Sequence, residues 1–244
     1  MNPIIVDGFA FRIPGLPSRY RANCSKDFGQ FVTSTMPADI NCSKAEKAGF
    51  TRGSFVEIAM CAIATKVLTF KPHYENEFFT EIWRIPVGGE MKTRFHEKCS
   101  ELSTFLIHRQ SQDKLKALVE TFGREVFNNW VTEGMPGDAQ EYALEKSTEV
   151  YFNNIFRFEM TQRDGNYGPY FYISTTTRPI ATPFEEAAVK AAKQICESDK
   201  TLNTGWCVDQ RLVENQQLCL AMSSTPDEAI ELAASPATRQ IKGK

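Results

Sequence analysis

One segment past the middle of the chain constrains the fold more than any other. Residues Ile155–Arg178 read IFRFEMTQRDGNYGPYFYISTTTR, two alternating runs around Asp164–Gly165. Side chains of a strand alternate between its two faces, and an Asp-Gly pair accepts the positive φ angles of a tight turn. The segment is therefore predicted to form a β-hairpin.

The two faces of this hairpin differ in chemistry. One face carries Phe156, Phe158, Met160, Phe171 and Ile173. These apolar side chains must align toward a core, because a shift of one residue would turn them to solvent. The opposite face holds Arg157, Glu159, Thr161, Arg163, Tyr170, Tyr172, Ser174, Thr176 and Arg178. Tyrosines flanked by arginines can stack on bases and hold phosphates, so this face is the first candidate site.

Strand and helix patterns occupy separate parts of the remaining chain. Gly29–Thr35, Phe55–Phe70 and Phe78–Pro86 favour strands, although the second run could equally be a buried helix. Within Asp113–Trp130 apolar residues recur at three- and four-residue steps, which predicts an amphipathic helix. The side chains expected to be buried on this helix are Leu115, Leu118, Phe122 and Phe127.

Two later segments carry the same helix-capping pattern. Thr182-Pro183-Phe184-Glu185 and Thr225-Pro226-Asp227-Glu228 place threonine at the cap, proline in the first turn and glutamate where it can bond back to the cap nitrogen. The first predicts a helix to about Cys196 and the second a short Ala-rich helix. Between them, Gly205–Met222 is expected to return one or two strands to the sheet.

Strand runs that are separated from helical runs favour an α+β fold with an antiparallel sheet over a doubly wound parallel sheet. We expect a single domain over residues 1–234 of the 244. It is strand-rich over 1–90, has a helical middle region over 91–148, and adds the hairpin plus a helix over 149–222. Residues 235–244 carry Arg239, Lys242 and Lys244 without an acid and form a basic tail.

Charge is balanced overall but basic in one N-terminal segment. The formal net charge of −2 argues against a protein that coats duplex DNA through many phosphate contacts. Gly8–Lys26 nevertheless holds Arg12, Arg19, Arg21 and Lys26 and contains no Asp or Glu. Its prolines predict a loop. Arg19-Tyr20-Arg21 alternates cation and ring, as strand-binding loops do.

No motif for catalysis or metal binding stands out. His96 and Cys99 are three residues apart, but no second pair has zinc-finger spacing. Walker loops, G-x-S-x-G and H-E-x-x-H are missing from the sequence. We therefore expect a protein without metal or cofactor that is not an enzyme.

The sequence also bears on location. Met1–Asp7 lacks a secretory pattern, and the apolar run Phe55–Phe70 contains Glu57 and Lys66 and is too short to span a bilayer. The seven cysteines are odd in number and scattered, which favours thiols in a reducing cytoplasm. The expectation is a cytoplasmic protein that does not contact a membrane.

The hairpin turn resembles a known family. Asp164-Gly165-Asn166-Tyr167-Gly168-Pro169-Tyr170-Phe171 between alternating runs is similar to hairpins of OB-fold single-stranded DNA-binding proteins encoded by phages and plasmids. The resemblance implies a small OB-like Greek-key barrel whose strand faces and loops hold the nucleic acid without a cofactor.

Three functions remain compatible with the sequence. The first is an accessory protein of replication, recombination or an RNA-guided complex that binds single-stranded DNA or RNA. The residues expected to make the contacts are Arg19, Arg21, Arg157, Arg163, Tyr170, Tyr172 and Arg178. The second is a structural or assembly subunit that uses the same Tyr/Arg surface for a protein complex or homo-oligomer. The third is an enzyme without a recognisable motif.

Overall fold

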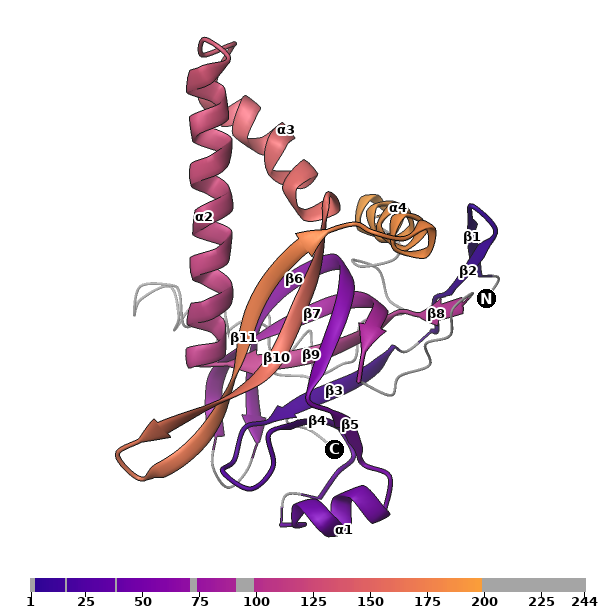
Figure 1. Cartoon of the computed structure of the whole chain (residues 1–244), viewed down its shortest axis with the longest axis vertical. Coiled ribbons are helices and arrows are strands. Elements are labelled where there is room, and N and C mark those ends of the chain that lie inside the picture. The colour runs from indigo at the N-terminus through magenta and orange to yellow at the C-terminus, as the bar shows by residue number, and fades with distance from the viewer. Residues whose placement is uncertain (1–2, 16, 38, 71–73, 91–98, 199–244) are drawn as a thin grey trace, which may run out of the picture.

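A computed structural model describes residues 3–15, 17–37, 39–70, 74–90 and 99–198 (Figure 1). The main sheet contains, in spatial order, β11 (Gly168–Pro179), β10 (Asn154–Gly165), β6 (Phe55–Phe70), β7 (Tyr74–Gly89), β9 (Ser103–His108), β3 (Ser18–Asn23), β4 (Gln30–Thr33) and β5 (Thr51–Gly53). A smaller sheet contains β1 (Ile4–Val6), β2 (Phe9–Arg12) and β8 (Cys99–Glu101). The helices are α1 (Cys42–Lys47), α2 (Gln110–Thr132), α3 (Ala139–Phe152) and α4 (Pro183–Glu197). Within these ranges no helix is both long and apolar enough to cross a membrane.

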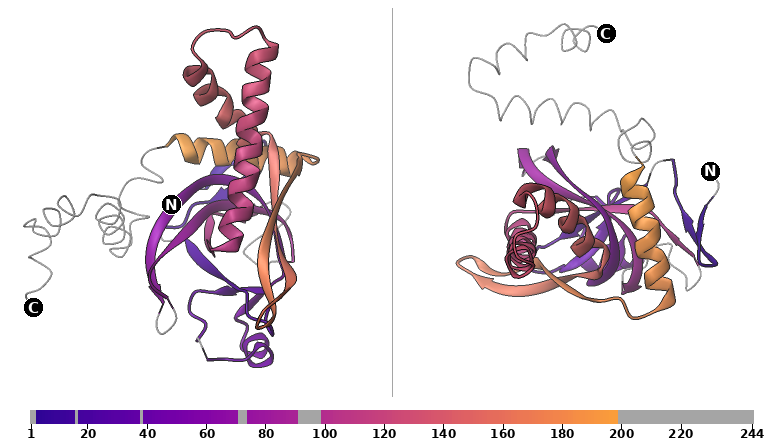
Figure 2. Two further views of the ribbon diagram at one scale, coloured as in Figure 1. Left: turned by 90° about the vertical axis from the view of Figure 1, so that its left-hand side faces the viewer. Right: turned by 90° about the horizontal axis from the view of Figure 1, so that it is seen from above.

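The main sheet is predominantly antiparallel, which confirms the predicted α+β class. Its one parallel pair joins β3 to β9, and β2 pairs with β8 in parallel in the smaller sheet. The sheet curls but is not closed into a barrel (Figure 2). One backbone hydrogen bond joins the edge strand β11 to the end of β3 across the curled sheet. Phe171 N on β11 donates to the carbonyl of Cys24, directly after β3, at 3.0 Å. Gly29 leaves room for this approach, because a Cβ there would lie 2.6 Å from the Phe171 ring.

Helices cover the sheet on both sides. Seen from above, α2 and α4 lie on opposite sides of the curled sheet (Figure 2). The small residues of α4 pack with Trp83 and Ile85 into one core. On the other face, Leu115 and Phe122 of α2 pack with the rings of Phe156 and Phe158. The far half of α2 extends beyond the sheet, and α3 returns from its end toward α4 (Figure 1).

The predicted hairpin is formed by β10 and β11. Phe156, Phe158 and Ile173 are fully buried, and Met160 pairs across the strands with Ile173 as the apolar pattern requires. The turn lies later than predicted, since Asp164–Gly165 still belongs to β10 and Gly165 pairs with Gly168. The positive φ that turn chemistry needs is supplied by Gly168, at +104°, so the strands extend by two more residues.

Several other predicted elements are confirmed. Phe55–Phe70 is a strand along its whole length, so the helical alternative is wrong. β7 contains the predicted Phe78–Pro86 and ends at Gly89. α4 begins at the predicted capping box and ends one residue past Cys196. The second capping box at Thr225, the predicted strands within Gly205–Met222 and the basic tail 235–244 lie outside the described residues.

The cap of α4 is expected to contribute measurably to stability. Thr182 Oγ1 accepts a hydrogen bond from Glu185 N at 3.2 Å, and Glu185 Oε2 accepts one from Thr182 N at 3.2 Å. Thr182→Ala should therefore lower the free energy of unfolding by about 1 kcal/mol in urea titrations. Thr132→Ala, at the exposed end of α2, is the control and should change stability by less than half as much. Equal losses in the two variants would show that the cap is unimportant.

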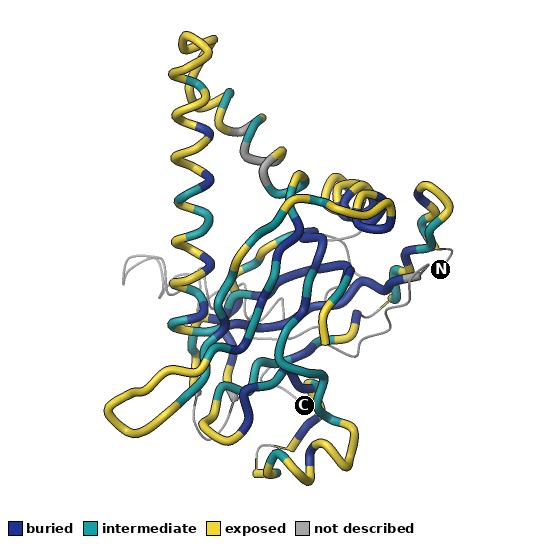
Figure 3. Tube along the Cα trace, in the orientation of Figure 1, coloured by how far each residue is buried: buried dark blue, intermediate teal, exposed yellow. Residues whose placement is uncertain are grey.

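Three sequence-based predictions are wrong. The N-terminal segment predicted as a loop contains the strands β2 and β3, and Tyr20 is buried in the core. The region 91–148, predicted to be helical, contains the strands β8 and β9 within Cys99–His108. Phe127 is 57% exposed although Val126 beside it is buried, because it points away from the stripe that Leu115, Phe122 and Val126 form on α2. Much of the outer part of α2 is exposed (Figure 3).

Candidate functional site

The structure separates the seven predicted contact residues into four groups. Arg157 and Arg178 lie at the end of the hairpin nearest α4. Arg178 Nη2 lies 2.7 Å from Glu57 Oε2 and 2.7 Å from Glu185 Oε1. Hydrogen bonds that Arg178 donates to Glu185 and Glu57 raise the pKa of Arg178 above its usual value. Arg178 is therefore already engaged with two carboxylates.

Arg157 is paired in the same cluster of charges. Its Nε donates to Glu159 Oε2 at 3.0 Å, and its Nη1 lies 3.8 Å from Glu57 Oε1. The guanidinium also lies 4.0 Å from the centre of the Phe55 ring. These contacts give Arg157 and Arg178 a structural role in joining β10 and β11 to β6 and α4.

Arg19 lies on β3 and is also paired. Its Nε donates to Glu81 Oε1 at 2.9 Å, and Lys66 Nζ lies 4.0 Å from Glu81 Oε2. The Glu81 side chain is 0% exposed and Lys66 is nearly buried, whereas Arg19 is partly exposed. Arg19 therefore compensates a buried charge.

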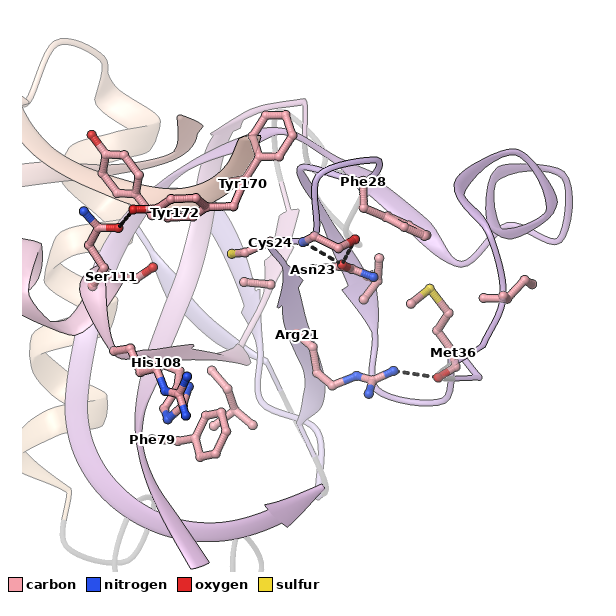
Figure 4. Close-up of a pocket in the computed structure, with 18 residues that line it drawn as sticks. Arg21, Asn23, Cys24, Phe28, Met36, Phe79, His108, Ser111, Tyr170 and Tyr172 are labelled. Atoms are coloured by element: carbon pink, nitrogen blue, oxygen red, sulfur yellow. Dashed lines mark hydrogen bonds between the residues drawn. The ribbon is translucent and has the colours of Figure 1, made fainter. Parts of the chain in front are cut away.

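Arg21, Tyr170 and Tyr172 come together around a cavity of about 760 Å³ (Figure 4). The cavity lies between the residues that follow β3 and β4, the end of β9, the first residues of α2 and the start of β11. Among the described residues that line it there are two arginines and a histidine but no Asp or Glu. Aromatic rings come from Phe28, Phe79, Tyr170, Phe171 and Tyr172.

The first turns of α2 fix the two tyrosines. Tyr170 Oη donates to Gln110 Oε1 at 2.8 Å, and Lys114 Nζ lies 5.8 Å from the centre of the Tyr172 ring. Ser111 Oγ accepts from Ile173 N at 2.9 Å and so anchors β11 between them. Both rings are half-buried and held in place, unlike the open tyrosine platform that the sequence predicts.

Arg21 reaches into the cavity from β3. Its Nη2 donates to the Met36 carbonyl at 2.6 Å, and its Nε is buried without a hydrogen-bond partner among the described residues. Burial lowers the pKa of Arg21, although a guanidinium stays charged at neutral pH. The side chain therefore brings a positive charge with spare donor capacity to the cavity wall.

A second group of side chains on the cavity wall comes from the junction of β9 with α2. The His108 ring stacks on Phe79, with centres 4.3 Å apart and planes at 18°. Glu77 accepts from Arg109 Nη2 at 3.2 Å, and its other oxygen lies 3.3 Å from His108 Nε2. Burial lowers the pKa of His108, so its ring is neutral at pH 7. The wall therefore presents a flat aromatic pair beside one arginine.

Arg163 lies on a second hollow at the tip of the hairpin. The lining of this hollow includes Lys26, Arg163, Asp164, Tyr167 and Tyr170. Lys26 and Arg163 are exposed, and no ion pair to either occurs within the described ranges. Tyr170 lines both hollows, so the cavity and the hairpin tip are neighbours.

No protein-family model, curated protein or solved structure matches this chain. The geometry of the site therefore has to be interpreted from its own chemistry.

Metal and nucleophile chemistry find little support at the site. In the part of the chain that the structure describes, no three His, Cys, Asp or Glu side chains are grouped to hold a metal. The candidate pair His96 and Cys99 falls outside the side chains described. Cys24 lines the cavity, but burial raises the pKa of its thiol to about 12, so it is protonated at neutral pH.

Several residues of the cavity carry no signal in the sequence. Phe79, His108, Arg109 and Phe28 belong to three separate segments, and none shows a motif spacing. The one local signal is indirect. Gln112 caps α2 by accepting from Arg109 N at 2.9 Å, which fixes Arg109 at the junction with β9.

Proposed function

We propose that this protein is a non-catalytic accessory protein that binds single-stranded nucleic acid across the cavity and the hairpin tip. The observation that carries the proposal is the composition of these two adjoining hollows. Their linings include four cations, Arg21, Arg109, Lys26 and Arg163, against one acid, Asp164. Tyr170 lies where the two hollows meet.

This composition suits a single strand for physical reasons. Aromatic faces stack on bases with about 1–3 kcal/mol each and with little preference for sequence, while cations follow the phosphates. The net charge of −2 over the chain means that attraction to phosphate is local to this surface. Arg19, Arg157 and Arg178 are left out of the proposed interface because carboxylates engage them and they line neither hollow. Arg109 is kept because it lines the cavity, although Glu77 pairs with it.

Two finer proposals belong with this function. The resemblance to OB-fold proteins of replication, recombination or related complexes stays a prediction, and the curl of the sheet toward Cys24 is its structural support. We place the protein in a reducing cytoplasm because Cys24, Cys42, Cys61 and Cys196 are free thiols.

A structural or assembly role is the second candidate. Tyr167 is fully exposed at the hairpin tip, next to the exposed Arg163. Tyrosine and arginine are also enriched in protein interfaces. A partner protein or a second copy of the chain would then occupy the same surface.

Anisotropy of labelled oligonucleotides between about 50 and 200 mM salt tests the nucleic-acid function. Lys26→Ala and Arg163→Ala should each lower the salt slope by about 0.7, since each removes one phosphate contact with a single strand. Arg157→Ala, on the same hairpin but paired with Glu159, is the matched control and should leave the slope unchanged.

Absence of oligonucleotide binding by the wild-type protein at the lowest salt would overturn the proposal. Equal effects of Arg157→Ala and Arg163→Ala would also contradict it, because the surface would then not be localised. If Arg163→Ala instead changes the molar mass in light scattering, the assembly role is favoured.

A further inference from the structure

The lining of the cavity beside α2 combines apolar and cationic side chains. Phe28, Val32, Met36 and Ile40 are apolar. The cations are Arg109 and Arg21, and Arg21 points toward Met36 (Figure 4). A ligand that fits this lining has a flat or apolar part and an anionic part.

Arg21 marks the position of the anionic part. Its Nε is a buried donor without a partner among the described residues, although its Nη2 is bonded to Met36. Nε is closed off from the cavity, so a bound anion would be held by the positive charge of the guanidinium and by its other N–H groups. No carboxylate of the described lining competes for this guanidinium.

Aromatic rings mark the position of the flat part. Phe79 and the neutral His108 form a parallel stacked pair on one side of the cavity, and Tyr170 and Tyr172 lie on another (Figure 4). The hydrogen bond to Gln110 holds the Tyr170 ring in one orientation. Rings fixed in this way stack on a planar group at a low cost in side-chain entropy.

The size of the cavity limits the ligand. A volume of about 760 Å³ lies within the range of sites for small molecules and cofactors. A long strand cannot be enclosed in this space, whereas one unit of it can.

From these observations we infer that the cavity binds a single phosphorylated nucleotide unit. The phosphate lies at Arg21 and Arg109, and the base lies among the rings. This inference rests on the proposed function for its choice of ligand, and adds that one unit enters the cavity while the rest follows the hairpin tip. A free nucleoside monophosphate and the phosphorylated end of a strand share this chemistry.

Calorimetry with the full chain distinguishes a free nucleoside monophosphate from the phosphorylated end of a strand as the ligand. The probes are adenosine 5′-monophosphate, adenosine, and one oligonucleotide with and without a 5′-phosphate. The monophosphate should bind at least about tenfold more tightly than adenosine, because charged hydrogen bonds to phosphate are lost in the nucleoside. A strand-end site would also bind the 5′-phosphorylated oligonucleotide more tightly than the unphosphorylated one.

Substitutions assign the phosphate to its residues. Arg21→Gln should weaken the binding of the monophosphate by about tenfold or more and leave the affinity for adenosine unchanged. Arg124→Gln is the matched control, because Arg124 is exposed on α2 away from the cavity lining. Arg109→Gln is the second test should Arg21→Gln fail to fold, since the Arg109 side chain is 65% exposed.

The outcomes distinguish the two proposals. If oligonucleotides bind but the monophosphate does not, and a 5′-phosphate has no effect, this inference is overturned and the strand-binding function stands. If the monophosphate binds through Arg21 but no oligonucleotide binds, the inference is supported for a free nucleotide and the strand-binding function is overturned. Equal affinity for adenosine and its monophosphate would overturn the phosphate assignment.

Discussion

Phe105→Ala is expected to lower the free energy of unfolding by about 3–5 kcal/mol. Phe105 is fully buried on β9, and its ring packs edge-on against Phe31 and Phe158 at centre distances of 5.3 and 5.0 Å. The Arg84 guanidinium lies 5.2 Å from the same ring. Truncation loses the free energy gained by burying the ring. It also leaves a cavity between three strands of one sheet, which cannot move together to fill it.

A thermal melt checks this expectation. In a domain of this size the loss corresponds to a fall of about 6–20 °C in Tm. Phe127→Ala is the matched control, since it deletes the same atoms from a ring that is 57% exposed. Its cost should stay within about 1 kcal/mol, and a loss as large as that of Phe105→Ala would contradict the core assignment.

Glu81→Ala is expected to have an effect of similar size, about 3–5 kcal/mol in urea denaturation, for an electrostatic reason. The carboxylate is fully buried, and its removal takes away a counter-charge that Lys66 and Arg19 share. Lys66 is the more affected of the two, because its side chain is 7% exposed whereas Arg19 is 22% exposed and can turn to water.

A second substitution distinguishes charge from packing in this cluster. Glu81→Ala combined with Lys66→Met should recover part of the loss, since the buried ammonium that faced Glu81 is then gone. Glu120→Ala breaks a surface pair with Lys116 and should cost less than about 0.5 kcal/mol. A double variant less stable than Glu81→Ala alone would show that packing dominates.

The parts of the fold that the sequence predicts well are those with local causes. The alternation of Ile155–Arg178 determines which face of the hairpin is buried, and the capping box at Thr182 determines where α4 begins. Phe127 shows the limit of such reasoning. It does lie on a helix, but the side that is buried at this turn is that of Val126, and which side of α2 meets the rest of the protein depends on tertiary packing.

The candidate site depends on contacts that no local pattern encodes. Arg178 lies on the predicted polar face, but Glu57, which neutralises it, is 121 residues away in the sequence. Arg19 and Arg21 are nearly adjacent, yet one is paired with Glu81 and the other reaches the cavity. Pro14, Gly15 and Pro17 suggest a loop there, whereas pairing with β9 and β4 makes Ser18–Asn23 a strand.

The hydrogen bonds along β11 have a consequence for self-association. β11 is an edge strand, and an edge with unpaired amides is a template on which another chain can add a strand. The amides of Phe171 and Ile173 are instead occupied by Cys24 and by Ser111 at the start of α2. The opposite edge is β5, which has three residues and offers little length for pairing. Ser111 in the first turn of α2 therefore makes one amide of this edge unavailable to another strand, at the same place where α2 lines the cavity.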